Sequence, residues 1–292
     1  MKNTAIIYYT NNLLPKALFE FTLKEVIKHS EENDCEAIMI SHFPVLINHE
    51  KNEDLLEGNE IYQNDFDKDT GKTKKSEIYN YIVKDIRIEN KNAKNYVVGK
   101  LPYSWESIFK QILLSLEKTN ADNIILMEHD CLYPSNYIEN VEKLLNQFDF
   151  TYCSQNHSFL NPNGFFNLES DVFVLSGCSG KKELWKRVLN KKIELINNKK
   201  PFFFEPILDI EPSVKKEKYP EEIIINKHVC MDHFLGAGHS ILDIKHSLNS
   251  DGMLLGNYYD QHEYWGEAKR YTKLLNDISD SKWNYGVAKL NY

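Results

Sequence analysis

Two carboxylates end an apolar run near the middle of this chain. Residues 124–127 are Ile, Ile, Leu and Met, and Glu128, His129 and Asp130 follow them directly. Because side chains alternate along a strand, Glu128 and Asp130 would share a face while His129 points away. Hard cations such as Mg²⁺ and Mn²⁺ prefer a few oxygen ligands together with substrate phosphates. The spacing predicts a divalent-cation site and group transfer from a metal-bound diphosphate, although a strand that ends in solvated acids has the same pattern.

Strand and helix patterns place these acids at one edge of a sheet. Residues 4–9 and 37–40 form two β-rich apolar runs, and residues 15–29 between them carry apolar side chains at helical spacing. This order predicts a βαβ unit and therefore a parallel sheet. A helix over 105–118 leads into the strand that ends at Glu128. The fold class is therefore α/β, with ligands expected at the carboxyl ends of the strands.

The remaining segments are assigned from the same signals. Residues 48–100 are rich in polar side chains and are interpreted as an excursion from the sheet, whereas 136–147 has a helical pattern. Residues 155–164 are dense in turn formers and predict a loop. An apolar strand over 172–177 precedes a basic helix that starts at Lys181. An irregular region follows.

Composition limits the class of protein. The chain has 292 residues, 42% hydrophobic and 27% charged, which is typical of a soluble globular protein. It has neither an apolar run of membrane-spanning length nor a signal-peptide layout, and its five scattered cysteines favour reduced thiols in the cytoplasm. The net charge of −8 argues mildly against nonspecific nucleic-acid binding, whereas the lysine cluster within 181–200 argues for it.

Short motifs spread over the chain match a known family. They are YYTNN at 8–12, SHFP at 41–44, FKQIL at 109–113, EHDCLYP at 128–134, LSG at 175–177, FEP at 204–206 and DIKH at 243–246. On these residues the chain resembles the GT-A-type nucleotide-sugar glycosyltransferases, in particular a phage and bacterial group with a Glu-His-Asp form of the DxD motif. Two positions depart from the family pattern: Asn11 replaces a common aspartate, and Ser247 replaces an expected glycine.

The resemblance implies an architecture. We expect a GT-A-like (Rossmann-like), mostly parallel central sheet flanked by helices, with an irregular C-terminal acceptor region. Residues 1–292 would form a single catalytic domain. Residues 1–135 would be the nucleotide-sugar-binding half, and residues 136–292 the acceptor-side half with a C-terminal wrap. The expected location is the cytoplasm of a bacterium or of a phage-infected host.

The resemblance also implies a metal centre. Asp130 would bind Mn²⁺ or Mg²⁺, which bridges the diphosphate of the donor. Glu128 would assist through a bound water or a ribose hydroxyl. His246 would be a late ligand or a contact of the diphosphate, since a neutral imidazole can complete a mixed shell of oxygen and nitrogen.

Nucleotide contacts and a general base complete the expected site. Thr10 and Asn11 follow the first strand, and Ser41 and His42 follow the second, so the resemblance implies that they meet the base or the ribose. A reaction that inverts the sugar carbon needs a general base. Glu205 is the candidate, because its neighbours Phe202, Phe203 and Phe204 would raise its pKa.

The activity predicted in this way is transfer of a sugar from a nucleotide-sugar, most plausibly a UDP-sugar, to a hydroxyl. The acceptor is either a hydroxymethylated pyrimidine in phage DNA or a glycan. A nucleotidyltransferase or phosphotransferase of similar fold is one alternative, although residues 8–12 lack the glycine and lysine common in its phosphate loop. A non-catalytic nucleotide-binding module is the other. The oligomeric state is left open.

Overall fold

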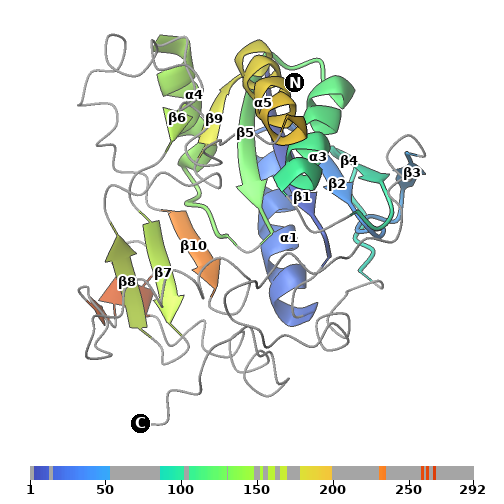
Figure 1. Cartoon of the computed structure of the whole chain (residues 1–292). Helices are drawn as coiled ribbons and strands as arrows, with labels where there is room; N and C mark the ends of the chain where they lie inside the picture. Colours follow the sequence, from blue (N-terminus) through green and yellow to red (C-terminus); the bar gives the residue numbers. More distant parts are fainter. Residues whose placement is uncertain are drawn as a thin grey trace, which may run out of the picture.

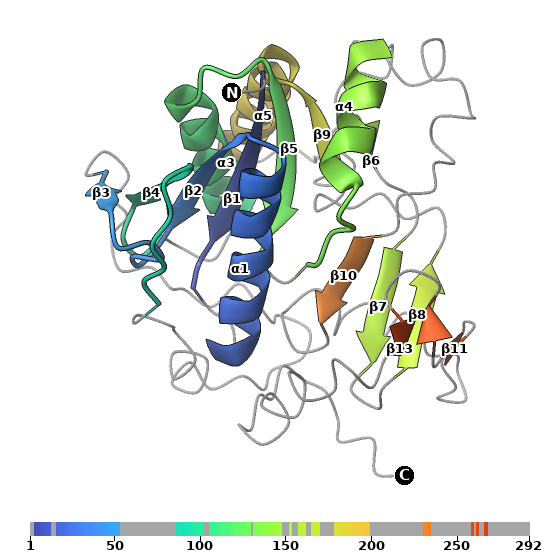
Figure 2. The same cartoon turned by 180° about the vertical axis from the view of Figure 1, so that it is seen from behind.

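The computed structural model describes part of the chain. The described residues are 3–12, 16–52, 86–101, 105–129, 131–147, 152–153, 157–161, 165–169, 178–198, 230–234, 258–259, 261–262 and 266–267. They form an α/β structure in which a mostly parallel sheet lies between helices (Figures 1 and 2). This agrees with the fold class expected from the sequence.

Seven strands form the main sheet, in the spatial order β3-β4-β2-β1-β5-β9-β6. Their bounds are β1 Thr4–Thr10, β2 Glu36–Ser41, β3 His49–Lys51, β4 Ala93–Val97, β5 Asn123–Glu128, β6 Tyr152–Cys153 and β9 Cys178–Lys181. β1 pairs in parallel with both β2 and β5, and β2 pairs in parallel with β4. β9 is the antiparallel member, because it runs against both β5 and β6.

Helices cover both faces of this sheet. Their bounds are α1 Lys16–Glu32, α3 Trp105–Lys118, α4 Tyr137–Gln147 and α5 Lys182–Asn197. Figure 1 shows α3 and α5 in front of the sheet, and Figure 2 shows α1 and α4 on the opposite face. None of the helices in the described ranges is both long and apolar enough to cross a membrane.

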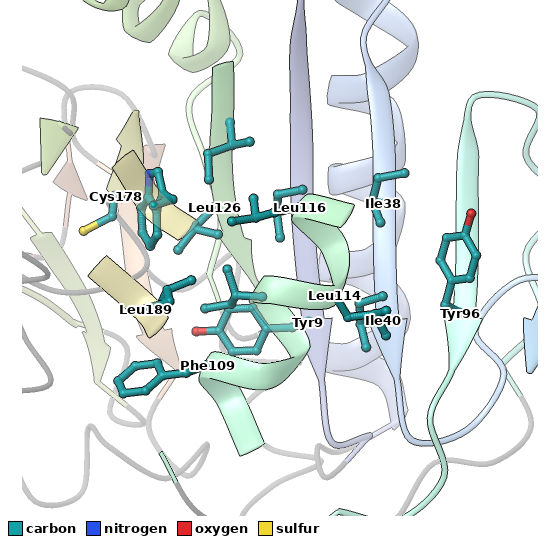
Figure 3. Packing of buried hydrophobic residues seen from close by; sticks show 14 of the residues in the cluster. Tyr9, Ile38, Ile40, Tyr96, Phe109, Leu114, Leu116, Leu126, Cys178 and Leu189 are labelled. Atoms are coloured by element: carbon teal, nitrogen blue, oxygen red, sulfur yellow. The ribbon is translucent and has the colours of Figure 1, made fainter. Parts of the chain in front are cut away.

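Alternation along the central strands divides the core into two layers. Ile7 and Tyr9 on β1 pack with Phe109 of α3 and Trp185 of α5 in one buried cluster (Figure 3). Tyr8 lies on the other side of β1 and is fully buried. Every residue of β1 is buried, as expected for a central parallel strand with helices on both faces.

A second sheet carries the later strands, in the order β10-β7-β8-β11. Their bounds are β7 His157–Asn161, β8 Phe165–Glu169, β10 Cys230–Phe234 and β11 Tyr258–Tyr259, and a short pair is formed by β12 Gln261–His262 with β13 Gly266–Glu267. In Figure 1 this sheet lies at the level toward which β5 points, with β10 nearest to the main sheet.

Several segment predictions are confirmed and two are wrong. The helix over 105–118 and the βαβ unit are present, and α1 and α4 lie within a few residues of their predicted bounds. The loop predicted over 155–164 is instead β7, paired antiparallel with β8, and the turn formers at 162–164 separate the two strands. The excursion predicted over 48–100 is wrong at its ends, because β3 and β4 join the main sheet. The strand predicted over 172–177 lies outside the described residues.

Candidate functional site

The strand order reverses at β1. From β1 the chain passes through α1 to β2 on one side, and it later returns through α3 to β5 on the other side. Tyr9 and Glu128 are register partners near the carboxyl ends of β1 and β5. In open α/β sheets ligands bind outside the carboxyl ends of the strands at such a reversal. The fold therefore brings Glu128 to the position where the chemistry of the sequence predicts a ligand.

Glu128 is held by contacts from two directions. The Tyr9 hydroxyl donates a hydrogen bond to Oε1 of Glu128, and the backbone N–H of Glu128 donates to the Tyr133 hydroxyl over 2.9 Å. The side chain of Glu128 is only partly buried, whereas Tyr9 is 5% and Tyr133 4% exposed. Two buried tyrosines thus bond to the partly exposed Glu128, Tyr9 through its carboxylate and Tyr133 through its backbone.

The backbone reverses immediately after Glu128. The Cys131 N–H donates to the Glu128 carbonyl over 3.4 Å, which closes a tight turn. Two side chains of α1 bond to the backbone of this segment. Thr22 Oγ1 donates to the His129 carbonyl over 2.6 Å, and His29 Nε2 bonds to the Tyr133 carbonyl over 3.1 Å. A carbonyl can only accept, so Nε2 of His29 carries the hydrogen.

His129 faces away from Glu128, as the alternation of the strand predicts. Its ring meets the ring of Phe19 on α1 edge to face, with 6.5 Å between centroids. Glu128 instead lies on the side of Tyr9, whose ring belongs to the cluster under α3. Asp130, the second acid of the motif, lies outside the described residues.

Hydrogen bonds join the loop after β1 to the loop after β2. Thr10 Oγ1 accepts from the Asn12 N–H over 2.9 Å, and Asn12 has a positive φ of 60°. The Asn12 side chain then makes two bonds to the backbone of Phe43, of 3.0 and 3.2 Å. Asparagine tolerates the left-handed region better than most residues, so this position suits it. Asn11 lies between them and is partly exposed.

Ser41 and His42 are buried at the end of β2. Ser41 Oγ accepts from Asn95 Nδ2 over 2.8 Å, and the oxygen of the same Asn95 amide accepts from the backbone N–H of Val45 over 3.0 Å. The His42 N–H donates to the Thr10 carbonyl over 3.3 Å. Burial, followed by the charge of nearby His129, lowers the pKa of His42 to about 3. His42 is therefore a neutral imidazole at pH 7.

Four predicted nucleotide contacts are thus close together at one edge of the sheet. Thr10, Asn11, Ser41 and His42 lie at the ends of two paired strands. Thr10 and Ser41 also hold their own loops, through the bonds described above. Sequence reasoning missed the residues that organise this edge, which are Tyr9, Asn12, Thr22, Asn95 and Tyr133. The residue type of Asn12 is a signal for a positive φ, because asparagine favours it. The roles of the other four residues depend on contacts between distant segments.

Of the predicted metal ligands, Glu128 lies within the described residues. Within the described ranges there is no group of three or more histidine, cysteine or acidic side chains that could hold a metal ion. The carboxylate of Glu128 is the ligand type that Mg²⁺ and Mn²⁺ prefer, and its place at the carboxyl edge fits such a site. Asp130, His246 and the predicted base Glu205 lie outside the described residues.

The basic segment of α5 is largely engaged within the molecule. Lys181, the last residue of β9, bonds to Asn123, and three lysines of α5 bond to a side chain or a carbonyl in the pairs Lys182–Thr119, Lys186–Glu183 and Lys191–Glu194. The Lys182 N–H also bonds to the Asp122 carbonyl at the amino end of β5. The start of α5 therefore lies at the edge of the sheet opposite to Glu128.

Comparisons with known proteins give distant likenesses. No family model matches the chain, and no curated protein matches it. Among solved structures, it is similar to a putative nucleotide-diphospho-sugar transferase from Desulfovibrio desulfuricans G20, with 11% identity over 63% of this chain and a TM-score of 0.29. It is also similar to TarS 1-349 of S. aureus, with 10% identity over 80% of this chain and a TM-score of 0.31.

A third solved structure is the bifunctional IspDF of Campylobacter jejuni, with 11% identity over 66% of this chain and a TM-score of 0.35. The chain spans 65%, 58% and 44% of the Desulfovibrio, S. aureus and Campylobacter chains, which is less than two thirds of each.

Proposed function

We propose that this protein is a metal-dependent glycosyltransferase that moves a sugar from a nucleotide-sugar, a UDP-sugar in the first instance, to a hydroxyl acceptor. The observation that carries the proposal is the position of Glu128. Its carboxylate lies at the carboxyl edge of the sheet, next to β1 and at the reversal of strand order, where a ligand is expected.

The residues of this edge have separate roles in the proposal. Glu128 accepts hydrogen bonds from a metal-bound water or from a ribose hydroxyl. Asp130 and His246 are the proposed metal ligands, and Glu205 is the proposed base for an inverting reaction. When bound, Mn²⁺ or Mg²⁺ supplies Lewis-acid stabilisation of the charge that builds on the leaving diphosphate.

The proposal gives His42 a specific part. Because the pKa of His42 is lowered to about 3, its ring carries no charge at neutral pH and does not neutralise a phosphate. A neutral imidazole instead offers one donor and one acceptor. We therefore place His42, with Asn11, beside the base or the ribose rather than beside the diphosphate.

The first test is a thermal-shift panel. UDP, GDP, CDP and their common sugar derivatives are each added with Mn²⁺ and with EDTA. Binding to the folded state stabilises it by about 2.7 kcal/mol at a ligand concentration one hundred times Kd, which corresponds to a shift of several degrees. We expect a shift with one nucleotide class that disappears in EDTA. The absence of any shift would favour a chain without a donor site.

The second test separates the reaction types. With the donor so identified, release of a nucleoside diphosphate indicates glycosyl transfer, whereas release of pyrophosphate from a nucleoside triphosphate indicates nucleotidyl transfer. Acceptors offered in parallel are DNA with and without hydroxymethylated pyrimidines, and a glycan. Each result assigns one of the two acceptor classes.

Asp130→Ala is the decisive variant. We expect it to lower donor hydrolysis and transfer at least a hundredfold, since it removes the proposed ligand of the metal, and to leave the melting temperature nearly unchanged. Asp122→Ala is the matched control, because Asp122 precedes the opposite end of β5 and bonds to Asn3. Full turnover by Asp130→Ala would contradict the metal assignment.

A further inference from the structure

Two tyrosine hydroxyls meet at Glu128, and neither was expected from the motif. One belongs to Tyr9 on β1 and the other to Tyr133, which follows the turn after β5. They approach different parts of Glu128: the Tyr9 hydroxyl bonds to the carboxylate, and the Tyr133 hydroxyl bonds to the backbone N–H. The side chain and the main chain of Glu128 are thus held separately.

Tyr9 is fixed by its own packing. Its ring is 5% exposed and lies in the same buried cluster as Phe109 and Leu126 (Figure 3). A tyrosine has only two side-chain torsions, so burial of the ring also fixes the place of its hydroxyl. The register of β1 against β5 sets Tyr9 beside Glu128.

Tyr133 is fixed from three directions. Its ring lies 5.0 Å from that of Tyr137, its carbonyl accepts from His29 of α1, and its hydroxyl accepts from the Glu128 N–H. The chain that leaves Glu128 therefore returns to it. The turn between them is also bonded to Thr22 through the His129 carbonyl.

We infer that Tyr9 and Tyr133 are positioning residues: Tyr9 holds the carboxylate of Glu128, and Tyr133 holds the backbone from which it projects, in one orientation toward the ligand of the proposed donor site. This inference rests on the proposed function. A carboxylate accepts several partners at once, so the bond from Tyr9 is compatible with a second bond to a ribose hydroxyl or a metal-bound water.

Fixing Glu128 in advance has a measurable effect. A long, flexible side chain loses rotamer freedom when it binds a ligand, and this loss weakens binding. Tyr9 orders the side chain already in the folded protein. Removal of the hydroxyl restores the freedom of Glu128, and affinity falls without any loss of a direct contact to the ligand.

The test uses Tyr9→Phe, Tyr133→Phe and Tyr8→Phe in the full chain. Tyr8→Phe is the matched control, because it removes a hydroxyl from the adjacent residue on the opposite side of β1. Binding of UDP, GDP and CDP with Mn²⁺ is measured by titration calorimetry, and folding by thermal unfolding. We expect Tyr9→Phe and Tyr133→Phe to weaken binding by up to roughly tenfold, the size of the penalty for ordering one flexible side chain on binding, and Tyr8→Phe to leave binding unchanged.

A double variant separates positioning from general destabilisation. In a Glu128→Ala background, Tyr9→Phe has no carboxylate left to orient, so it should weaken binding no further. An additional tenfold loss in that background would overturn the inference, because Tyr9 would then act on the ligand by another route. Equal weakening by Tyr8→Phe would also overturn it.

The outcomes distinguish this inference from the proposed function. If the wild-type chain binds a diphosphate with Mn²⁺ and both Tyr9→Phe and Tyr133→Phe match it, the positioning role is wrong and the proposed function stands. If the wild-type chain binds none of the three diphosphates, the proposed function is wrong, and the positioning role is wrong with it.

Discussion

At the scale of single residues, the edge of the sheet is built from polar groups that are buried together. Thr10, Ser41, His42 and Asn95 are each almost inaccessible to water. Burial of such groups is costly unless they are bonded, and here the Asn95 amide and the backbone of the two loops supply the partners. The side chains of Ser41 and Asn95 therefore bond to each other and to the backbone rather than to solvent.

His42 gives this edge a dependence on pH. Its folded pKa of about 3 lies below the ordinary value of 6.5, so the unfolded chain binds the proton more tightly. The free energy of unfolding therefore falls as the pH drops from about 6.5 toward about 3. We expect this residue to remove about 2 kcal/mol between pH 7 and pH 5. Urea unfolding at a series of pH values measures the loss.

The variant His42→Gln identifies the source of that dependence. It removes the titrating group, so the stability of the variant should change less steeply between pH 7 and pH 5, whatever its absolute value. Nearby His129 contributes to the lowered pKa of His42 and remains in the variant, as does His29, whose pKa burial also lowers. An unchanged slope would show that His42 is not the source of the acid sensitivity.

At the scale of elements, α1 determines where the turn that follows Glu128 lies. Thr22 bonds to the His129 carbonyl, His29 bonds to the Tyr133 carbonyl, and Phe19 packs on the His129 ring. Phe19 and Thr22 lie one turn of the helix apart and His29 lies two turns further on, so the three residues share one face of the helix. The turn after β5 is therefore held by contacts with α1, although α1 lies about one hundred residues earlier in the chain.

Thr22→Val tests these contacts. Valine keeps the branched shape but has no hydroxyl, so the His129 carbonyl loses its partner, and we expect a loss of about 1–2 kcal/mol in urea unfolding. Ser115→Ala is the control, since Ser115 is also buried but its hydroxyl bonds to the carbonyl of Gln111 in its own helix. Equal effects of the two substitutions would show that the bond between α1 and the turn adds nothing specific.

Elements with strong periodicity were predictable, and those held by distant partners were not. The apolar stripe of α3 predicts its bounds, and the alternation around Glu128 correctly turns His129 to the other face. β4 was missed because it is short and carries Lys94 and Asn95. The burial of Asn95 makes sense only once the backbone that bonds to its amide is known.

The same reason limits prediction of the site. The motif identifies Glu128 from its own sequence neighbourhood. Tyr9 is 119 residues away along the chain, and no local pattern reveals that the two are register partners. Such pairs follow from the order of strands in the sheet, which a single sequence leaves open.

At the scale of the whole molecule, the net negative charge and the paired lysines of α5 both disfavour nonspecific binding to DNA. The net charge is −8, and lysines of α5 are bonded to glutamates of the same helix. Such exposed pairs weaken the field that a phosphate backbone would meet. The start of this helix also lies at the opposite edge from Glu128.

We therefore expect α5 to contribute little to any binding of DNA. Replacing Lys186 and Lys191 by alanine should leave the affinity for duplex DNA and its salt dependence unchanged, as measured by fluorescence anisotropy between 50 and about 200 mM salt. A drop in affinity, with a salt slope shallower by about one unit for each lysine, would instead make α5 a phosphate contact. That result would favour a DNA acceptor over a glycan.

The place of β5 between β1 and β9 also has a consequence during synthesis of the chain. At 5–20 residues per second, on the order of ten seconds separate the appearance of Tyr9 from that of its partner Glu128. β5 then waits with an open edge until β9, at Cys178–Lys181, emerges and pairs with it. An unpaired apolar edge invites pairing with other chains. Nascent chains stalled before residue 178 should therefore depend on chaperones more than those released after residue 198.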